Sequence, residues 1–471
     1  IESNLQTPAL TEEPSKSEAI VMKDIRHFLT YLLSFKRLAL TNASMIIDDT
    51  KTGKRIFVPL LDFQLRKHRL KQYQINLKTN IRMQEDTMHL KGNATLNLIA
   101  QTASFDFFFD KINLSKAERI VPLLKGLNVP LQGEISGTLD FAQKQDHWRN
   151  MFKKLNFTIN TIQAGDVQLP EPLNTIYPVS YLVASGSFTE RLNALKIKPI
   201  TASLTTGLTS DVAIDVSGIG TFLDTNDFNH VKTILKAKLI NIPIEEIPSV
   251  WPSYLGPTAH EWVKKNLKDG SATTALFALY FKGIELTDLK GNIDVKNVTV
   301  DYLSPMQPVK NVAGKVLLYP DKVEIYANTG TINNIQLHVG NVYLTNLQDD
   351  ISQAKIELDI AGPLPEILTL IDSKPLTLLS DFAIIPDKTN GNGKGQITLS
   401  FPLTSALKPK DVLVDVNASV TNGSFKTPSG EEILNNASLT VLVNNDELSI
   451  QGNGLHKQVP LNIKWSEFFF P

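Results

Sequence analysis

The side chains that most often do chemistry in proteins are scattered along this sequence and form no recognisable site. No cysteine occurs among the 471 residues, which removes disulfide frameworks, thiolate metal sites and cysteine nucleophiles. His260-Glu261 is followed by no partner histidine, so we predict an ordinary pair on a helix surface. No two histidines share a metal-ligand spacing on one predicted element; the eight are His27, His68, His89, His147, His230, His260, His338 and His456.

Signatures of acyl transfer and phosphate binding are also missing. The sequence contains neither GxSxG nor GxxxxGK[ST]. Residues Gly391–Gly395 are rich in glycine but lead into a predicted strand, whereas a phosphate loop needs a helix N-terminus behind it. We therefore predict a flexible turn there, and a protein that is not an enzyme and uses no cofactor and no metal.

The overall charge argues against a nucleic-acid partner. The formal net charge is −1 and the pI is about 6.8, without the basic excess that nucleic-acid binders usually show. Hydrophobic residues make up 42% of the chain and charged residues 20%, so the chain can bury a substantial core. No run of apolar residues is long enough to span a bilayer.

The elements that must position any site alternate strictly between apolar and polar residues. Ile135 and Leu139 alternate with Glu134, Ser136 and Thr138, and the same period of two recurs over most of the chain after residue 37. Such alternation gives each strand one wet and one dry face, which is typical of antiparallel sheets.

Four helices interrupt this pattern. An apolar stripe of helical period covers residues 18–35, and shorter helices are predicted over 115–127, from Pro257 to Leu267, and from Pro365 to Ile371. Gly270 stands where the second short helix must end. The three short helices are plugs on a sheet or lids over its dry face, and both interpretations stay open.

An internal repeat links two parts of the chain. Residues 309–325 align without gaps on residues 434–450, which pairs Asn311 with Asn436 and Asp321 with Asp446. Looser copies cover 178–197 and 42–77. Each copy reads as a hairpin, so we predict an elongated sheet in which each block contacts chiefly its neighbours.

The dry faces permit two interpretations. A sandwich or barrel would fill its core with its own side chains, whereas an open sheet of this length would need to curl and hold an apolar ligand. The inward members of the alternating strands are the candidate groove residues in the second case. They are Leu96, Leu98, Phe105, Phe107, Phe109, Ile135, Leu139, Phe141, Leu155, Phe157, Ile159, Ile356, Leu358, Ile360, Ile397, Leu399 and Phe401.

The segment between Ile242 and Gly270 has the most distinctive sequence in the chain. It resembles the signature of the AsmA-like envelope proteins of the YhdP type, in which a Trp-Pro pair precedes a helix and a strand pair. The matching positions are Trp251, Pro252, Ala259, Trp262, Val263, Asn266, Leu267 and Gly270. His260 departs from the pattern, since the family usually has arginine there. The resemblance covers about residues 115–460 and is strongest over 242–375.

The resemblance implies a fold and a role. The implied fold is mainly β, an elongated, strongly curved antiparallel repeating β-groove sheet with a few short capping helices. The implied role is periplasmic phospholipid transport between the inner and outer membranes. The anchor in the inner membrane would lie outside this segment, which we expect to be part of a longer protein.

Two other functions compete with this one. A non-transporting β-repeat scaffold of the cell envelope would keep a filled core. A glycan-acting enzyme needs facing carboxylates, but the acidic residues here fall mostly on the wet faces.

The predicted organisation has four segments. A polar leader and helix occupy 1–37, a first β-groove segment 38–240, the signature segment with its helix and hairpins 241–375, and a further, truncated groove repeat 376–471.

Overall fold

The computed structural model describes most of the chain beyond its first thirty residues. Described are residues 31–469 except 32, 50–53, 69–70, 84–85, 114–126, 142–150, 169–175, 190–193, 206–210, 222–231, 252–255, 283–284, 375, 380–383 and 405–406. The helices predicted over 18–35 and 115–127 fall almost wholly outside the described residues.

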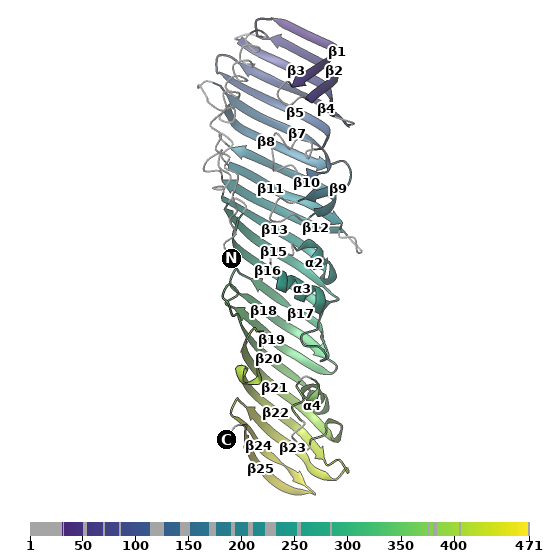
Figure 1. Cartoon of the computed structure of the whole chain (residues 1–471), viewed down its shortest axis with the longest axis vertical. Coiled ribbons are helices and arrows are strands. Elements are labelled where there is room, and N and C mark those ends of the chain that lie inside the picture. Colours follow the sequence, from purple (N-terminus) through teal and green to yellow (C-terminus); the bar gives the residue numbers. More distant parts are fainter. Residues whose placement is uncertain are drawn as a thin grey trace. The chain divides into compact units, whose positions relative to one another are not determined.

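The protein is mainly β, as the alternation predicts (Figure 1). It divides into two compact units. The first unit comprises Ile1–Thr205, Asp215–Ile234 and Phe281–Glu285, and the second comprises Thr206–Ile214, Leu235–Tyr280 and Leu286–Pro471. Each is built on a large antiparallel sheet.

In the first unit, sequential hairpins join β1 to β5. β5 then pairs with β7, β7 with β8, β8 with β10 and β10 with β11, while short β9 pairs with both β6 and β10. The bounds are β1 (Arg37–Asp49), β2 (Lys54–Lys67), β3 (Gln72–Met83), β4 (Asp86–Asn97), β5 (Thr102–Asn113), β6 (Leu127–Asn128), β7 (Pro130–Asp140), β8 (Phe152–Thr161), β9 (Gly165–Gln168), β10 (Ile176–Thr189) and β11 (Ala194–Thr205).

The second unit continues the pattern. β13 pairs with β15, β14 with β16, and β16 to β25 pair in sequence order. β12 (Asp211–Thr221) has residues in both units. The other bounds are β13 (Lys232–Pro243), β14 (Leu267–Lys268), β15 (Ser271–Lys282), β16 (Glu285–Val300), β17 (Val309–Leu318), β18 (Val323–Ile332), β19 (Ile335–Thr345), β20 (Gln353–Pro363), β21 (Thr389–Pro402), β22 (Leu413–Lys426), β23 (Glu432–Val443), β24 (Glu447–His456) and β25 (Val459–Phe468).

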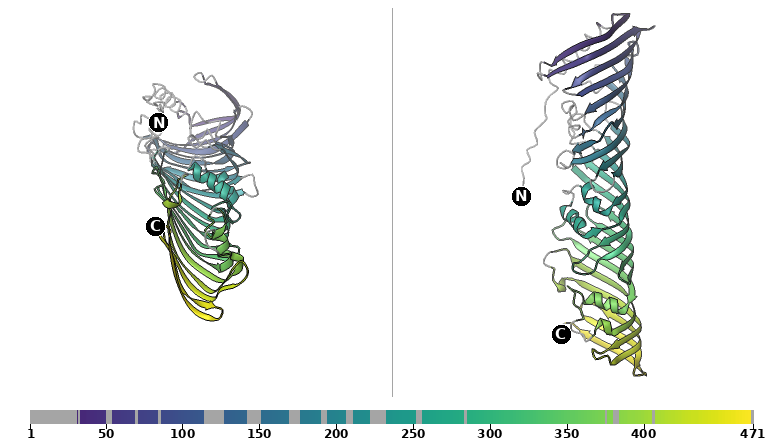
Figure 2. Two further views of the ribbon diagram at one scale, coloured as in Figure 1. Left: turned by 60° about the horizontal axis from the view of Figure 1, so that its bottom comes forward. Right: turned by 90° about the vertical axis from the view of Figure 1, so that its right-hand side faces the viewer.

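The short helices of the second unit start where strands end in proline. Pro243 ends β13 before η7 (Ile244–Glu246) and α2 (Ile247–Val250), and Pro363 ends β20 before α4 (Leu364–Asp372). α3 (Pro257–Asn266) follows α2, and the single turns η8 (Pro386–Lys388) and η9 (Pro409–Asp411) precede β21 and β22. The helices predicted from Pro257 and Pro365 are confirmed to within one residue. Figure 2 shows α3 and α4 on the same side of this unit's sheet.

The repeat over 309–325 and 434–450 is confirmed in the backbone. Asn311 and Asn436 both adopt left-handed φ, 56° and 44°, and both lie in a register shift of their strand pair. The turns that follow are closed alike, since Tyr319 N donates to Lys322 O at 2.9 Å and Asn444 N to Glu447 O at 3.0 Å. Because asparagine tolerates the left-handed region, it supplies the bulge that both copies share.

The prediction of a flexible turn at Gly391–Gly395 was wrong. These residues lie inside β21 and pair with both β20 and β22. One of these glycines, Gly393, allows the close approach of a helix, described below, and none marks a chain reversal.

Candidate functional site

Register brings the apolar residues of the first unit into one continuous surface, which we call the first apolar face. Phe107 of β5 lies opposite Gly92 of β4 and Ile135 of β7, and Ile135 lies opposite Phe157 of β8. The face comprises Leu61, Phe63, Leu65, Tyr73, Ile75, Leu77, Leu90, Ala94, Leu96, Ala103, Phe105, Phe107, Phe109, Ile135, Leu139, Leu155, Phe157, Ile159, Ala184 and Phe188.

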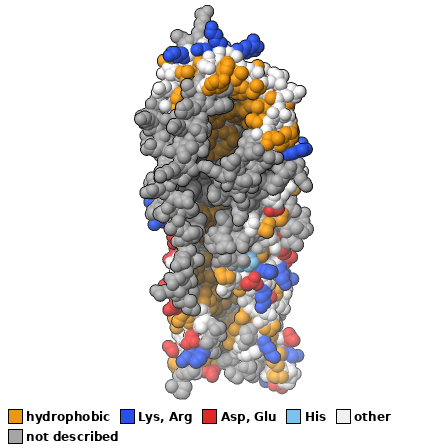
Figure 3. All heavy atoms as spheres, turned by 45° about the horizontal axis from the view of Figure 1, so that its top comes forward, with side chains coloured by type: hydrophobic (Ala, Val, Ile, Leu, Met, Phe, Trp, Pro, Cys, Tyr) orange, Lys and Arg blue, Asp and Glu red, His pale blue; other side chains and the backbone are white. Residues whose placement is uncertain are grey.

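Most side chains of this face are only half-buried. Phe105, Phe107 and Phe157 all keep part of their surface exposed, although they lie in the middle of the sheet. Figure 3 shows hydrophobic side chains lining a hollow near the end of the unit that carries β1. A face whose apolar side chains stay open along several strands is a surface that an apolar ligand can occupy.

Glycines make room for the phenylalanine rings of the first apolar face. A Cβ on Gly92 would lie 2.5 Å from Cδ1 of Phe107, and one on Gly137 would lie 2.7 Å from Cζ of Phe105. Each ring therefore extends across the neighbouring strand, where only a residue without a side chain can lie beneath it. Gly-aromatic pairing of this kind gives each ring the space it occupies over the neighbouring strand.

The rings also touch one another. The centroids of Phe105 and Phe107 are 5.8 Å apart, those of Phe105 and Phe152 are 6.4 Å apart, and those of Phe157 and Phe188 are 6.2 Å apart. Phe152 and Phe188 were not among the predicted residues. The alternation of β8 and β10 contains both, but only the strand register shows that they reach the phenylalanines of β5 and β8.

The second unit carries a comparable surface, the second apolar face, in which aliphatic side chains predominate and Phe401 is the one aromatic member that we include. One row across the sheet runs from Ile293 through Val316, Ile325, Val342 and Ile356 to Leu399. The face comprises Ile293, Val295, Val316, Ile325, Val342, Ile356, Leu358, Ile360, Ile397, Leu399, Phe401, Val414, Val416, Ala418, Val420, Leu439, Val441, Ile450 and Ile463.

The structure thus gathers the candidate residues into two groups, one in each unit. Leu98 lies in the turn after β4 and Phe141 one residue beyond β7, so both stand at the margin of the first face. The other candidates of residues 96–159 lie on the first face, and those of residues 356–401 lie on the second.

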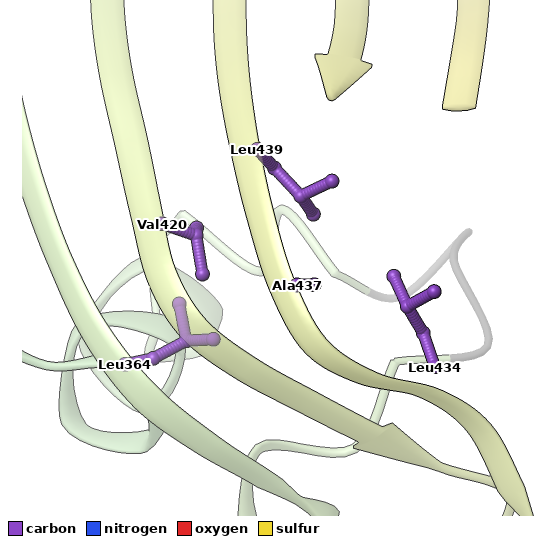
Figure 4. Packing of buried hydrophobic residues seen from close by; sticks show 5 residues of the cluster. All are labelled: Leu364, Val420, Leu434, Ala437 and Leu439. Atoms are coloured by element: carbon purple, nitrogen blue, oxygen red, sulfur yellow. The ribbon is translucent and has the colours of Figure 1, made fainter. Parts of the chain in front are cut away.

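Helix α4 covers part of the second apolar face. Leu364, only 4% exposed, packs with Val420, Leu434, Ala437 and Leu439 (Figure 4). The helix can approach so closely because β21 carries a glycine beneath it. A Cβ on Gly393 would lie 2.8 Å from Cδ1 of Ile367.

A polar contact fixes the start of the same helix. Glu366 accepts hydrogen bonds from the backbone N of Asn334 at 3.0 Å and from its Nδ2 at 2.6 Å. Both hydrogen bonds lower the pKa of Glu366 from its ordinary value, and the one from the Asn334 side chain has the larger effect. This contact and the packing of Leu364 in the buried cluster hold α4 as a cap on the sheet.

The signature segment forms a second cap. Ile247 of α2 and Ile293 of the second apolar face pack against a cluster of Leu239, Ile242, Ala272 and Ala275. Leu267 pairs with Val300, and Gly270 takes φ 67° against the backbone of Asn297. Val263 is half-buried and Trp262 is 44% exposed. Pro252 lies outside the described residues.

The prediction of His260-Glu261 as a helix-surface pair was wrong for the histidine. His260 is 7% exposed, its Nε2 lies 3.0 Å from Pro248 O, and its ring packs edge-on against Trp251 at 5.7 Å. Its Nδ1 lies 3.6 Å from Glu261 Oε1. The histidine therefore joins α3 to α2.

The opposite face of the second unit is charged. Lys322 Nζ lies 2.7 Å from Glu324, and Lys355 Nζ lies 2.7 Å from Glu357. The hydrogen bond from Lys322, with a further one from Tyr326, lowers the pKa of Glu324. The hydrogen bond between Lys322 and Glu324 also raises the pKa of Lys322. Each contact joins residues two positions apart along the chain, which lie on the same face of the sheet, so this face, opposite the second apolar face, stays charged and solvated.

Other classes of site are not seen in the described part of the chain. Those residues contain no group of three or more His, Asp or Glu side chains that could hold a metal ion. None of the described helices is both long enough and apolar enough to cross a membrane.

Comparison with known proteins supports the resemblance seen in the signature segment. No curated protein matches the chain. The model of one family, described as YhdP protein, matches residues 221–466, a little over half of the sequence and most of the second unit. The chain therefore belongs to the YhdP family.

Proposed function

We propose that this chain is a periplasmic lipid carrier whose two apolar faces hold the acyl chains of phospholipids. In this role it would serve transport between the inner and outer membranes, with an inner-membrane anchor outside the segment. The observation that carries the proposal is the first apolar face, a half-buried surface that runs unbroken from β2 to β10.

The physical task is to shield hydrocarbon from water. Exposing acyl chain to water costs about 0.8 kcal/mol for each CH₂, or roughly 12 kcal/mol for a chain of about sixteen carbons. Half-exposed phenylalanine and aliphatic side chains remove much of that cost, while a polar head group stays in solvent. The sheet supplies no energy, so net direction must come from a gradient or a partner.

The test uses two neighbouring phenylalanines on opposite faces of β5. Phe107 lies on the first apolar face opposite Gly92, whereas Phe108 lies on the other face, with Lys91 Nζ 4.9 Å from its ring. Phe107→Asp places a charge where acyl chains would lie, and Phe108→Asp makes the same chemical change on the wet side.

Native mass spectrometry with lipid extraction would measure lipid in the chain purified from bacteria without detergent. We expect diacyl lipids on the wild type and on Phe108→Asp, and their loss from Phe107→Asp, with circular dichroism unchanged in both variants. Lipid retained by a folded Phe107→Asp would overturn the proposal. A wild type without lipid would favour the alternative, a non-transporting scaffold whose core is filled by its own side chains. The buried cluster beneath α4 is one place where the protein's own side chains fill the space.

A further inference from the structure

Five basic side chains gather at one end of β1, β2 and β3, and we call this surface the basic edge. It consists of Lys36, Arg37, Arg66, Lys67 and Lys71, all exposed. Arg37 and Arg66 are register partners, and Lys67 N donates to Lys36 O at 2.9 Å. Figure 3 shows Lys and Arg side chains near this end of the unit.

The stretches of sequence that form this end of the neighbouring strands contain no acidic residue. The sequence has no Asp or Glu over residues 33–47, 63–83 and 87–105, which supply the neighbouring strands and turn. Like charges directly opposite each other on a sheet are destabilising, yet Arg37 faces Arg66. The near-neutral charge of the whole chain conceals this cluster, because its members come together only through the register of three strands.

Apolar side chains project beside the basic edge. Ile99 is 64% exposed in the turn between β4 and β5, and this turn is tied to the edge because Leu98 N donates to Lys71 O at 3.2 Å. Tyr31 is 67% exposed four residues before Phe35, which it meets edge-on at 5.5 Å. Asn97 Oδ1 holds the turn by accepting from Ile99 N and Ala100 N, both at 3.0 Å.

Basic side chains that form no ion pair within the described part of the chain, next to exposed apolar side chains, suit one kind of partner. Lys and Arg are attracted to anionic head groups, aromatic and aliphatic tips enter the boundary of the hydrocarbon, and the two effects add. A nucleic acid would use the cations, but the phosphate contacts that dominate its affinity draw no benefit from the exposed aliphatic side chain of Ile99. We propose that the basic edge binds the surface of an anionic lipid bilayer.

This inference rests on the proposed function, since a lipid carrier must meet a membrane to exchange its cargo. The first apolar face reaches the same edge, because Tyr73 belongs to that face and lies 5.5 Å from Lys67 Nζ. Docking there would bring the margin of the apolar face to the lipid surface.

The test is co-sedimentation of the chain with vesicles. Phosphatidylcholine vesicles are compared with vesicles that also contain phosphatidylglycerol, at low and high salt. The variant Arg37→Glu/Lys67→Glu/Lys71→Glu reverses the basic edge. The matched control Lys408→Glu/Lys410→Glu/Lys464→Glu makes the same change of net charge at exposed lysines of the second unit.

We expect binding only to the anionic vesicles, weakened by salt, and reduced more than about tenfold by the edge variant but little by the control. Ile99→Ser should reduce binding several-fold without changing its dependence on salt. Equal binding to both vesicle types, or equal loss in the two triple variants, would overturn the proposal. The proposal would also be overturned if a DNA duplex bound as tightly as the vesicles and if Ile99→Ser left that DNA affinity unchanged.

Two readouts keep the two proposals separate. Lipid extraction from the edge variant should still yield co-purified lipid, because none of its substitutions replaces a residue of the first apolar face. If the triple variant fails to fold, Lys71→Glu alone is measured in its place and should weaken anionic binding while circular dichroism is unchanged.

Discussion

The two apolar faces solve the same problem with different side chains. The first uses phenylalanine rings that lie across glycines, such as Phe107 across Gly92, and leaves them half-buried. The second uses rows of β-branched and aliphatic residues that fit side by side on the pleat, and α4 covers part of it. The difference teaches that an open apolar face can be built in two ways. Large rings fit where the residue on the neighbouring strand has no side chain, and smaller aliphatic side chains fit beside one another without such gaps.

The largest effect should come from the covered part of the second face. Leu364→Ala removes the side chain that seats α4 and should lower the free energy of unfolding by about 2–5 kcal/mol. Leu358→Ala, on the open part of the same face, should cost about 1 kcal/mol, because Leu358 is only half-buried. Denaturant melts of delipidated protein measure both. Equal losses of unfolding free energy in the two variants would mean that Leu364 does not anchor α4 to the sheet.

Glycine tests the comparison directly. Gly92→Ala forces a Cβ against the Phe107 ring and the backbone of Asp106, and should destabilise the first unit by about 1–3 kcal/mol. Gly395→Ala meets only Ala418 Cβ at 3.5 Å, and should be neutral or stabilising by up to about 1 kcal/mol. Thermal melts of the two variants give the sign. The comparison fails if Gly92→Ala is tolerated as well as Gly395→Ala.

The smallest effect concerns pH. The contacts from Asn334 lower the pKa of Glu366 in the folded state, so their contribution is present above the ordinary glutamate pKa and is lost as the pH falls through the lowered value. Between neutral pH and about pH 3, wild type should therefore lose more of α4's protection from hydrogen exchange than Glu366→Gln does. Identical acid sensitivity in the two proteins would show that the carboxylate does not hold the helix.

Much of this architecture could be predicted because alternation and register are tied together. Once residues such as Ile135 and Phe157 are known to alternate, antiparallel pairing places them on one face. The repeat that pairs Asn311 with Asn436 likewise predicted hairpins, and both asparagines occupy equivalent bulges.

The failures all involve contacts between separate elements, which the local pattern of residues does not reveal. Gly391–Gly395 has the composition of a turn, but it lies inside β21, where Gly393 leaves room for Ile367 of α4. His260 is polar and follows a proline at a helix start, yet Trp251 and Pro248 O enclose it. The basic edge is invisible in the total charge because Arg37 and Arg66 are brought together by pairing.

The asparagine bulges have a consequence for how such a chain can change in length. Asn297 and Asn311 take left-handed φ at the shifts of one strand pair, and Asn422 and Asn436 do so at the equivalent shifts of another. A slip by one residue would turn every apolar side chain to the wet side, and it would also move each bulge off its asparagine. A hairpin block that carries its own bulges therefore stays in phase with its neighbours, so whole blocks can be duplicated or deleted while the remaining apolar surface stays aligned.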